Sequence, residues 1–238
     1  MRRPLVSLAA AVVPLVLLSG CGAVGTDLRP GAAAVVDDEV VSMSEVEDVT
    51  DSLCTVLVSQ SSAAASDQPG APAASYPMGV VRAAAQRGLA LNIVADRIAE
   101  EQGLDVSEDL EAGIATVRNA YQGVDPALLE EALPGFTGDG HLDLVLTAWG
   151  REDLGEEASE EEARARGYEL GAEWADEHGL ESNPVFDSLQ IGEGGVAAAR
   201  EDLSVPASDW ARMAAAPASQ AEVTEVTREL PANQRCDG

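Results

Sequence analysis

The sequence contains no lysine, so its 14 basic residues are all arginines, against 42 aspartates and glutamates. The formal net charge is −28 at pH 7. Binding to nucleic acid needs a basic surface that neutralises phosphates, and attraction to anionic lipid head groups needs basic residues too. The charge balance therefore argues against nucleic acid as a partner, and any membrane attachment must come from another device.

Aromatic residues are also scarce, at 3% of the chain. The core must therefore be built from Leu, Val, Ile and Ala, a composition that suits helices. We expect a mostly α fold in one domain, with additional terminal segments.

Motifs that carry chemistry are missing as well. The sequence has no nucleophile elbow, phosphate-binding glycine loop or dinucleotide fingerprint. His141 and His178 belong to no recognised metal-ligand pattern, so we interpret them as a surface histidine or one in the last turn of a helix. The acidic residues between 152 and 162 lack the spacing of a calcium loop and indicate a solvated face. We expect no enzymatic activity, no metal and no cofactor.

The N-terminus holds the most specific signal. Arg2 and Arg3 precede an apolar run over residues 4–18, which ends in Leu18-Ser19-Gly20-Cys21. This order is typical of a secretory signal peptide, and its end resembles the bacterial lipobox, in which the cysteine receives the lipid. A membrane-spanning helix needs roughly 20 apolar residues, more than this run supplies. We predict a signal peptide over residues 1–20, lipidation of Cys21 and an extracytoplasmic protein held at the membrane by acyl chains.

Cys54 and Cys236 are the two remaining cysteines. An even pair in an oxidising compartment favours a disulfide. Such a bond would tie the C-terminal end to the first helix. The alternative is two free thiols, with Cys54 buried in the core.

The pattern along the chain predicts a tether over residues 21–31, a helical domain over 32–213 and a flexible tail over 214–238. Two short strands around an acidic turn predict a hairpin over residues 33–41. Ser44 and Glu47 form a candidate capping box for the first helix, and residues 59–76 have the composition of a loop.

Apolar spacing predicts the later helices. We expect a helix over 78–102 with a buried stripe that includes Val80 and Ala84, and a helix capped by Ser107. Further helices are expected over 126–133, 141–154 and from Ser159 to Gly179. The expected helix ends are Gly103 after the long helix, Asp125 as an N-cap, Pro134-Gly135 as a stop, and Ser159 with Glu162 as a second capping box. Residues 183–191 and 203–206 are expected to be extended.

The segment over residues 33–54 resembles the opening of the SurA N-terminal chaperone domain, of the peptide-binding type also found in trigger factor. The shared features are the strand Ala34-Val35-Val36, the acidic turn, the second strand Val40-Val41 and the capped helix start at Ser44. A later helix that ends in Glu100-Glu101-Gln102-Gly103-Leu104 before Val106-Ser107 is also similar to the family. Members often carry an Asn-Pro-Arg-aromatic-Gly strand near the C-terminus, whereas this chain keeps Asn183-Pro184 and Phe186 but has Val185 and Asp187.

The resemblance implies a holdase that covers unfolded or exported polypeptides in apolar grooves between helices. It also implies that the N-terminal hairpin pairs with a C-terminal strand. Many relatives insert a parvulin-type prolyl isomerase domain, and no gap in this chain is long enough for one. The alternative is a scaffold lipoprotein of the cell envelope that binds one folded partner.

Overall fold

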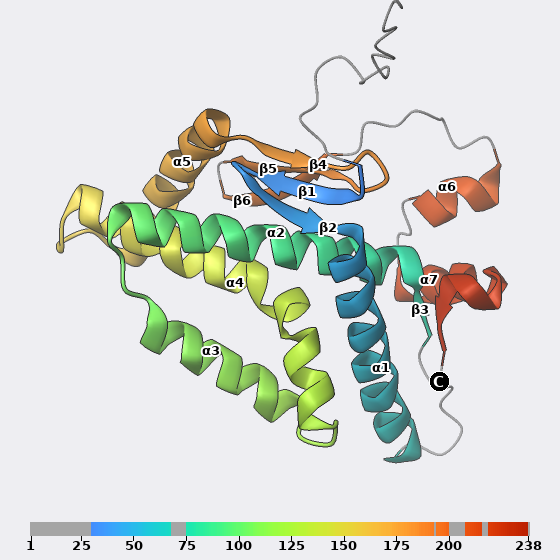
Figure 1. Ribbon diagram of the computed structural model, residues 1–238. Coiled ribbons are helices and arrows are strands. Elements are labelled where there is room, and N and C mark those ends of the chain that lie inside the picture. The colour runs from blue at the N-terminus through green and yellow to red at the C-terminus, as the bar shows by residue number, and fades with distance from the viewer. Residues whose placement is uncertain (1–29, 68–74, 193, 200–207, 216–218, 238) are drawn as a thin grey trace, which may run out of the picture.

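The computed structural model describes residues 30–67, 75–192, 194–199, 208–215 and 219–237 (Figure 1). The expected fold class is confirmed, because helices make up most of the described chain and the strands are short. The helices are α1 (Met43–Asp67), α2 (Met78–Gln102), α3 (Ser107–Ala120), α4 (Pro126–Leu154), α5 (Glu160–His178), α6 (Asp209–Ala215) and α7 (Gln220–Glu229). The strands are β1 (Ala32–Val36), β2 (Glu39–Ser42), β3 (Tyr76–Pro77), β4 (Leu180–Ser182), β5 (Ser188–Gly192), β6 (Gly195–Ala199) and β7 (Arg235–Cys236), and a 3₁₀ turn spans Ala232–Gln234.

The expected N-terminal hairpin is present. β1 and β2 pair around a turn in which Asp37 has a positive φ of 55°, a conformation that aspartate tolerates better than most residues. β4 pairs with the other edge of β1, with Ala34 opposite Ser182 and Val36 opposite Leu180. The hairpin is thus joined to a strand from much later in the chain. All five residues of the central strand β1 are buried.

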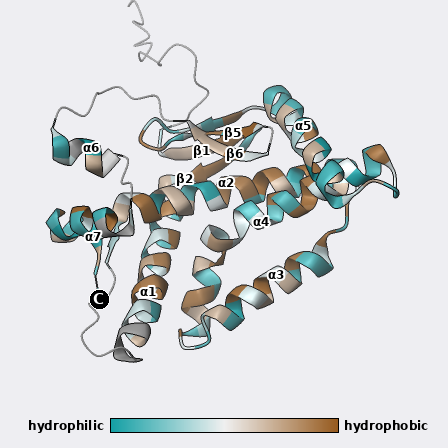
Figure 2. Cartoon of the chain, turned by 180° about the vertical axis from the view of Figure 1, so that it is seen from behind, coloured by the Kyte–Doolittle hydropathy of each residue, from teal (hydrophilic) through white to brown (hydrophobic). Residues whose placement is uncertain are grey.

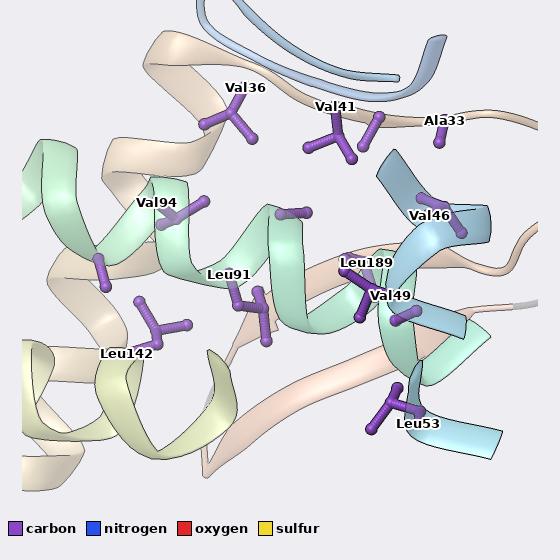
Figure 3. Close-up of a cluster of buried hydrophobic side chains, with 14 of the residues drawn as sticks. Ala33, Val36, Val41, Val46, Val49, Leu53, Leu91, Val94, Leu142 and Leu189 are labelled. Atoms are coloured by element: carbon purple, nitrogen blue, oxygen red, sulfur yellow. The ribbon is translucent and has the colours of Figure 1, made fainter. Parts of the chain in front are cut away.

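The core lies between this small sheet and the long helices (Figure 1). Figure 3 shows Val36 and Val41 from the hairpin above Leu91 and Val94 of α2, with Leu142 of α4 below. Each of these side chains is almost completely buried, and burying a Val or Leu side chain contributes about 1.5–3 kcal/mol. Aliphatic residues therefore form the core, as the scarcity of aromatics predicts.

Glycines allow the helices to approach closely. A Cβ atom at Gly88 of α2 would overlap the Pro134 carbonyl oxygen, and one at Gly138 of α4 would overlap the Gly88 backbone. At the crossing of α4 and α5, a Cβ at Gly150 or Gly167 would meet the backbone of the other helix in the same way. Both crossings are set by backbone-to-backbone contact, which only glycine permits.

Several helix ends confirm the sequence-based expectations. Gly103 ends α2 with φ 67°, and the Leu104 amide donates to the Ala99 carbonyl at 2.9 Å. Asp125 caps α4 by accepting from the Ala127 amide at 2.9 Å. Ser159 and Glu162 form the expected capping box of α5.

The start of α1 and its length differ from expectation. The capping box is formed by Ser42 and Glu45, not by Ser44 and Glu47: the Ser42 amide donates to Glu45 Oε2 at 2.7 Å, and the Glu45 amide donates to Ser42 Oγ at 3.2 Å. Residues 59–67, expected in a loop, continue the helix. Serine and alanine are compatible with a helix, so their abundance alone was a weak indicator of a loop.

The prediction that Pro134-Gly135 stops a helix is wrong. α4 continues through Pro134 to Leu154 and changes direction along its length (Figure 1), as expected for a helix with an internal proline.

The prediction that Ser107 caps α3 is also wrong, because Ser107 lies inside that helix and donates to Asp105. On α2, Val80 is 64% exposed and does not belong to the buried stripe; Ala84 is exposed as well.

The C-terminal part contains more regular structure than expected. Residues 183–187 form a turn between β4 and β5, and only residues 188–192 are a strand. Within the segment expected to be a flexible tail, α7 is a regular helix, and β7 pairs with β3. The expected extended segment over 203–206 lies outside the described residues.

Cys54 of α1 and Cys236 of β7 are brought together in a disulfide, with Cα atoms 5.3 Å apart. Both residues are buried, and the Met78 sulfur lies 3.5 Å from Cys54 Sγ and 3.9 Å from Cys236 Sγ. The bond links positions separated by 182 residues. It therefore ties the C-terminal strand to the first helix.

Removal of this bond is expected to destabilise the fold. Reduction, or the double change Cys54→Ala with Cys236→Ala, should lower the free energy of unfolding in urea by about 3–5 kcal/mol, because the cross-link restricts a long loop in the unfolded chain. The double variant is the control, since reductant should not change its stability further. Alkylation of either thiol in native protein that has not been reduced would show that the bond is absent.

Candidate functional site

A cleft of about 460 Å³ lies between α2, α3 and α4, beside β2 and the start of α1. Its size falls within the roughly 300–1,000 Å³ that is usual for ligand pockets. Both apolar and acidic residues contribute to its lining. The elements that form it are far apart in sequence, so the cleft is a product of the tertiary fold.

Helical periodicity places the lining residues of α2 and α4 on one face of each helix. α2 contributes Leu89, Asn92, Ile93 and Asp96, which follow at spacings of three, one and three. This face is separate from the fully buried one, which carries Leu91, Val94, Ala95 and Ile98. α4 contributes residues from Glu130 to His141, on both sides of Pro134.

α3 forms the outer wall. None of its residues is buried, although hydrophobic residues recur along it in Figure 2. Leu110 and Ile114 line the cleft. They lie outside the set of partly buried side chains that pack on the core, to which Val117 belongs. Their apolar surface therefore faces the cleft and not the core.

The C-terminal end of α3 is held firmly. The Tyr121 and Phe136 rings pack with centroids 4.9 Å apart, and Arg118 donates two hydrogen bonds to Glu130, at 2.7 and 2.9 Å. Gln60 of α1 donates to the Ala120 carbonyl at 3.2 Å. At the other end, Leu104 and Val106, just before α3, pack on the core. The helix is thus fixed near both ends, while its middle lines the cleft.

A polar group lies in the cleft where α2 and α4 meet. Asn92 Nδ2 donates to the carbonyls of Gly88 at 2.9 Å and Pro134 at 3.3 Å. Asn92 Oδ1 is therefore the acceptor that faces His141 Nδ1, at 3.1 Å. This arrangement assigns the proton of the neutral imidazole to Nδ1. His141 Nε2 is left as an acceptor, 3.8 Å from Asp96 Oδ1.

The interpretation of His141 as a surface or last-turn histidine is wrong. Its exposed fraction is only 6%, and it lies in the middle of α4. Burial lowers the pKa of its imidazole below the usual value, and the Asp96 carboxylate opposes this shift in part. Since desolvation is the larger effect, the ring is neutral at pH 7.

The charged residues of the cleft lining are all acidic: Glu39, Glu45, Asp96 and Glu130. Glu39 lies 3.5 Å from Arg97, Glu130 is bound by Arg118, and Glu45 accepts from the Ser42 amide. Asp96 differs from these three in its surroundings. Among the described residues its charge partner is His141, which is neutral, and the Asp96 side chain is 74% exposed. Asp96 is therefore the carboxylate most available to an occupant.

His178 lies in the last turn of α5, as expected. Its ring stacks on Trp174 with centroids 4.3 Å apart, and Trp174 Nε1 donates to Glu101 at 2.7 Å. This cluster joins the ends of α2 and α5 and does not line the cleft.

Among the described residues, no group of three or more histidine, cysteine or acidic side chains could hold a metal ion. No helix in the same part of the chain is long and apolar enough to cross a membrane.

Cys21, the predicted lipidation site, lies outside the described part of the chain. Cys54 and Cys236, the predicted disulfide pair, do not line the cleft. The sequence alone does not distinguish residues of a groove from residues of the core, so it predicts no particular peptide-binding residue. Leu89 and Ile93 carried a usable signal, since they lie four residues apart and off the main stripe of α2. Leu110 and Ile114 lie four residues apart, a spacing that places them on one face of a helix, but their exposure depends on how α3 docks.

No protein-family model, curated protein or solved structure matches this chain. The similarity to the SurA N-terminal domain stays a prediction, carried by the short motifs quoted for it.

The pKa of His141 can be measured by NMR titration of its ring. We expect it to lie below the value in the unfolded chain, so His141 makes the fold less stable as pH drops below about 6.5. The change Asp96→Asn should lower the pKa further, because it removes the charge that favours the imidazolium. Asp176→Asn, on the exposed surface of α5, is the control and should have no effect. A His141 pKa at or above the unfolded value would contradict this electrostatic picture.

Proposed function

We propose that this protein is an extracytoplasmic lipoprotein that binds unfolded or exported polypeptides without prolyl isomerase activity. The observation that carries the proposal is the cleft between α2, α3 and α4, into which Leu110 and Ile114 present apolar surface that the core does not use. A groove lined by helices with exposed apolar side chains suits an extended or helical peptide segment. The resemblance to the SurA N-terminal domain supports the same class of function.

The proposed location depends on two features. The disulfide-linked Cys54 and Cys236 fit an oxidising compartment. The basic pair, the apolar run and the Leu-Ser-Gly-Cys motif fit lipidation of Cys21. Two or three acyl chains on one cysteine would provide stable anchoring, where one chain would be marginal.

The anchor has a direct test in a bacterial host that processes lipoproteins. Labelled palmitate should be incorporated into the full chain, and Cys21→Ser should abolish both the label and recovery in the membrane fraction. The double variant Cys54→Ala with Cys236→Ala is the control and should keep the label. Incorporation into the Cys21→Ser chain would contradict lipidation at this residue.

Binding of unfolded protein can be tested with the full chain in lipid nanodiscs. At near-stoichiometric amounts it should suppress the aggregation of several unfolded exported proteins. Leu110→Ser with Ile114→Ser should reduce this suppression several-fold, because the change removes apolar contact area from the cleft wall. Their partial exposure means that folding should be retained, which circular dichroism would verify.

Val80→Ser with Val185→Ser is the matched control, because these apolar residues are 64% and 71% exposed and lie outside the cleft. It should leave the suppression unchanged. Lack of suppression for every client, together with one dominant folded partner in cross-linking, would overturn the proposal and support the scaffold alternative.

A further inference from the structure

Two hydrogen-bond acceptors lie close together in the cleft, His141 Nε2 and Asp96 Oδ1. No donor from the described residues lies between them. Asn92 fixes the imidazole so that Nδ1 is the donor, which leaves Nε2 of His141, a residue of the cleft lining, as an acceptor. Asp96 Oδ1 lies 3.8 Å from that nitrogen. A carboxylate and an unprotonated imidazole nitrogen cannot hydrogen-bond to each other, because neither supplies a hydrogen.

We propose that this pair of acceptors binds a cationic N–H group of the occupant, a guanidinium or an ammonium, while the adjacent apolar walls hold the residues next to it. The inference rests on the proposed function and deepens it by naming a substrate class: segments in which an arginine or lysine adjoins an apolar stretch. A water molecule can also donate to both acceptors. A cation does so more strongly, because its hydrogen bond to Asp96 is charge-assisted.

Charge and shape around the pair agree with such an occupant. Among the described residues no arginine lines the cleft, and Glu45 adds negative charge to the lining, whereas Glu39 and Glu130 are paired with Arg97 and Arg118. Ile93 lies one turn before Asp96 on α2, and Thr137 lies one turn before His141 on α4; both residues line the cleft, and the Thr137 hydroxyl is bonded to the Leu133 carbonyl. Leu110 and Ile114 close the opposite side. A side chain with an apolar stem and a cationic end matches these surroundings.

The test compares three short fluorescent peptides that share one apolar sequence and differ at one position: arginine, its neutral analogue citrulline, or glutamate. Binding to the full chain in nanodiscs is followed by fluorescence anisotropy at physiological salt. The arginine peptide should bind about five- to tenfold more tightly than the citrulline peptide, and the glutamate peptide should bind most weakly. In Asp96→Asn the ratio of arginine to citrulline affinity should fall to within about twofold, whereas Asp176→Asn should keep the wild-type ratio.

A second readout reports on His141 itself. The ¹⁵N chemical shift of Nε2 should change when the arginine peptide binds, and should change less with the citrulline peptide. Equal affinities for the arginine and citrulline peptides in wild-type protein, or an unchanged ratio in Asp96→Asn, would overturn the inference and leave the proposed function standing. If no peptide binds, both fail together.

Discussion

The close crossing of α2 and α4 is the constraint on which the rest of the structure depends. Gly88 meets the backbone of Pro134 and Gly138 with no room for a side chain. This approach lets Leu91 and Leu142 share one core (Figure 3), and it brings the Asn92 amide within reach of backbone carbonyls on both helices. The cleft lies beside this crossing, so its polar centre is positioned by backbone geometry and not by flexible side chains. Pro134 has no amide hydrogen, so the hydrogen bond that α4 loses is the one to the Glu130 carbonyl. The Asn92 amide donates to a different group, the Pro134 carbonyl, and so links α2 to α4 beside the proline.

The cleft also depends on the incomplete packing of α3 against the core. A helix with Leu110, Ile114, Val117 and Tyr121 on one face would normally bury all four against the core. Only its C-terminal end packs on the core, where Val117 and the adjacent Tyr121 are partly buried. Burial of a Leu or Ile side chain contributes about 1.5–3 kcal/mol, which Leu110 and Ile114 do not deliver in full because both stay partly exposed. An apolar occupant would recover part of this free energy, which is a physical reason for binding that needs no specific hydrogen bond.

Local chemistry explains which parts of this fold were predictable from sequence. The boundaries of α2, the caps at Gly103, Asp125 and Ser159, and the hairpin depend on residues near them in the chain, and all are confirmed. Pro134 was misinterpreted because tertiary contacts at Gly88 and Asn92 hold α4 together across it. The predicted capping box of Ser44 with Glu47 is wrong because Ser42 also has an acidic residue, Glu45, three positions later, and the pattern alone does not distinguish the two serines. His141 and Asp96 lie 45 positions apart by number, and their proximity follows only from the packing of α2 on α4.

The acidic residues have a different effect at the cleft than over the rest of the surface. Elsewhere the carboxylates are paired in many places, as in Arg87 with Asp139, Arg164 with Asp143 and Arg166 with Asp153. Exposed pairs of this kind contribute little to stability, but they occupy arginines that would otherwise neutralise other acids. At about 0.15 M salt the field of unpaired carboxylates extends only about 8 Å. Selection by charge is therefore restricted to groups that reach the cleft, where Asp96 lies next to an imidazole kept neutral by burial. The same composition that argues against nucleic acid and anionic lipid as partners thus favours, at the proposed cleft site, a cationic group on an apolar segment.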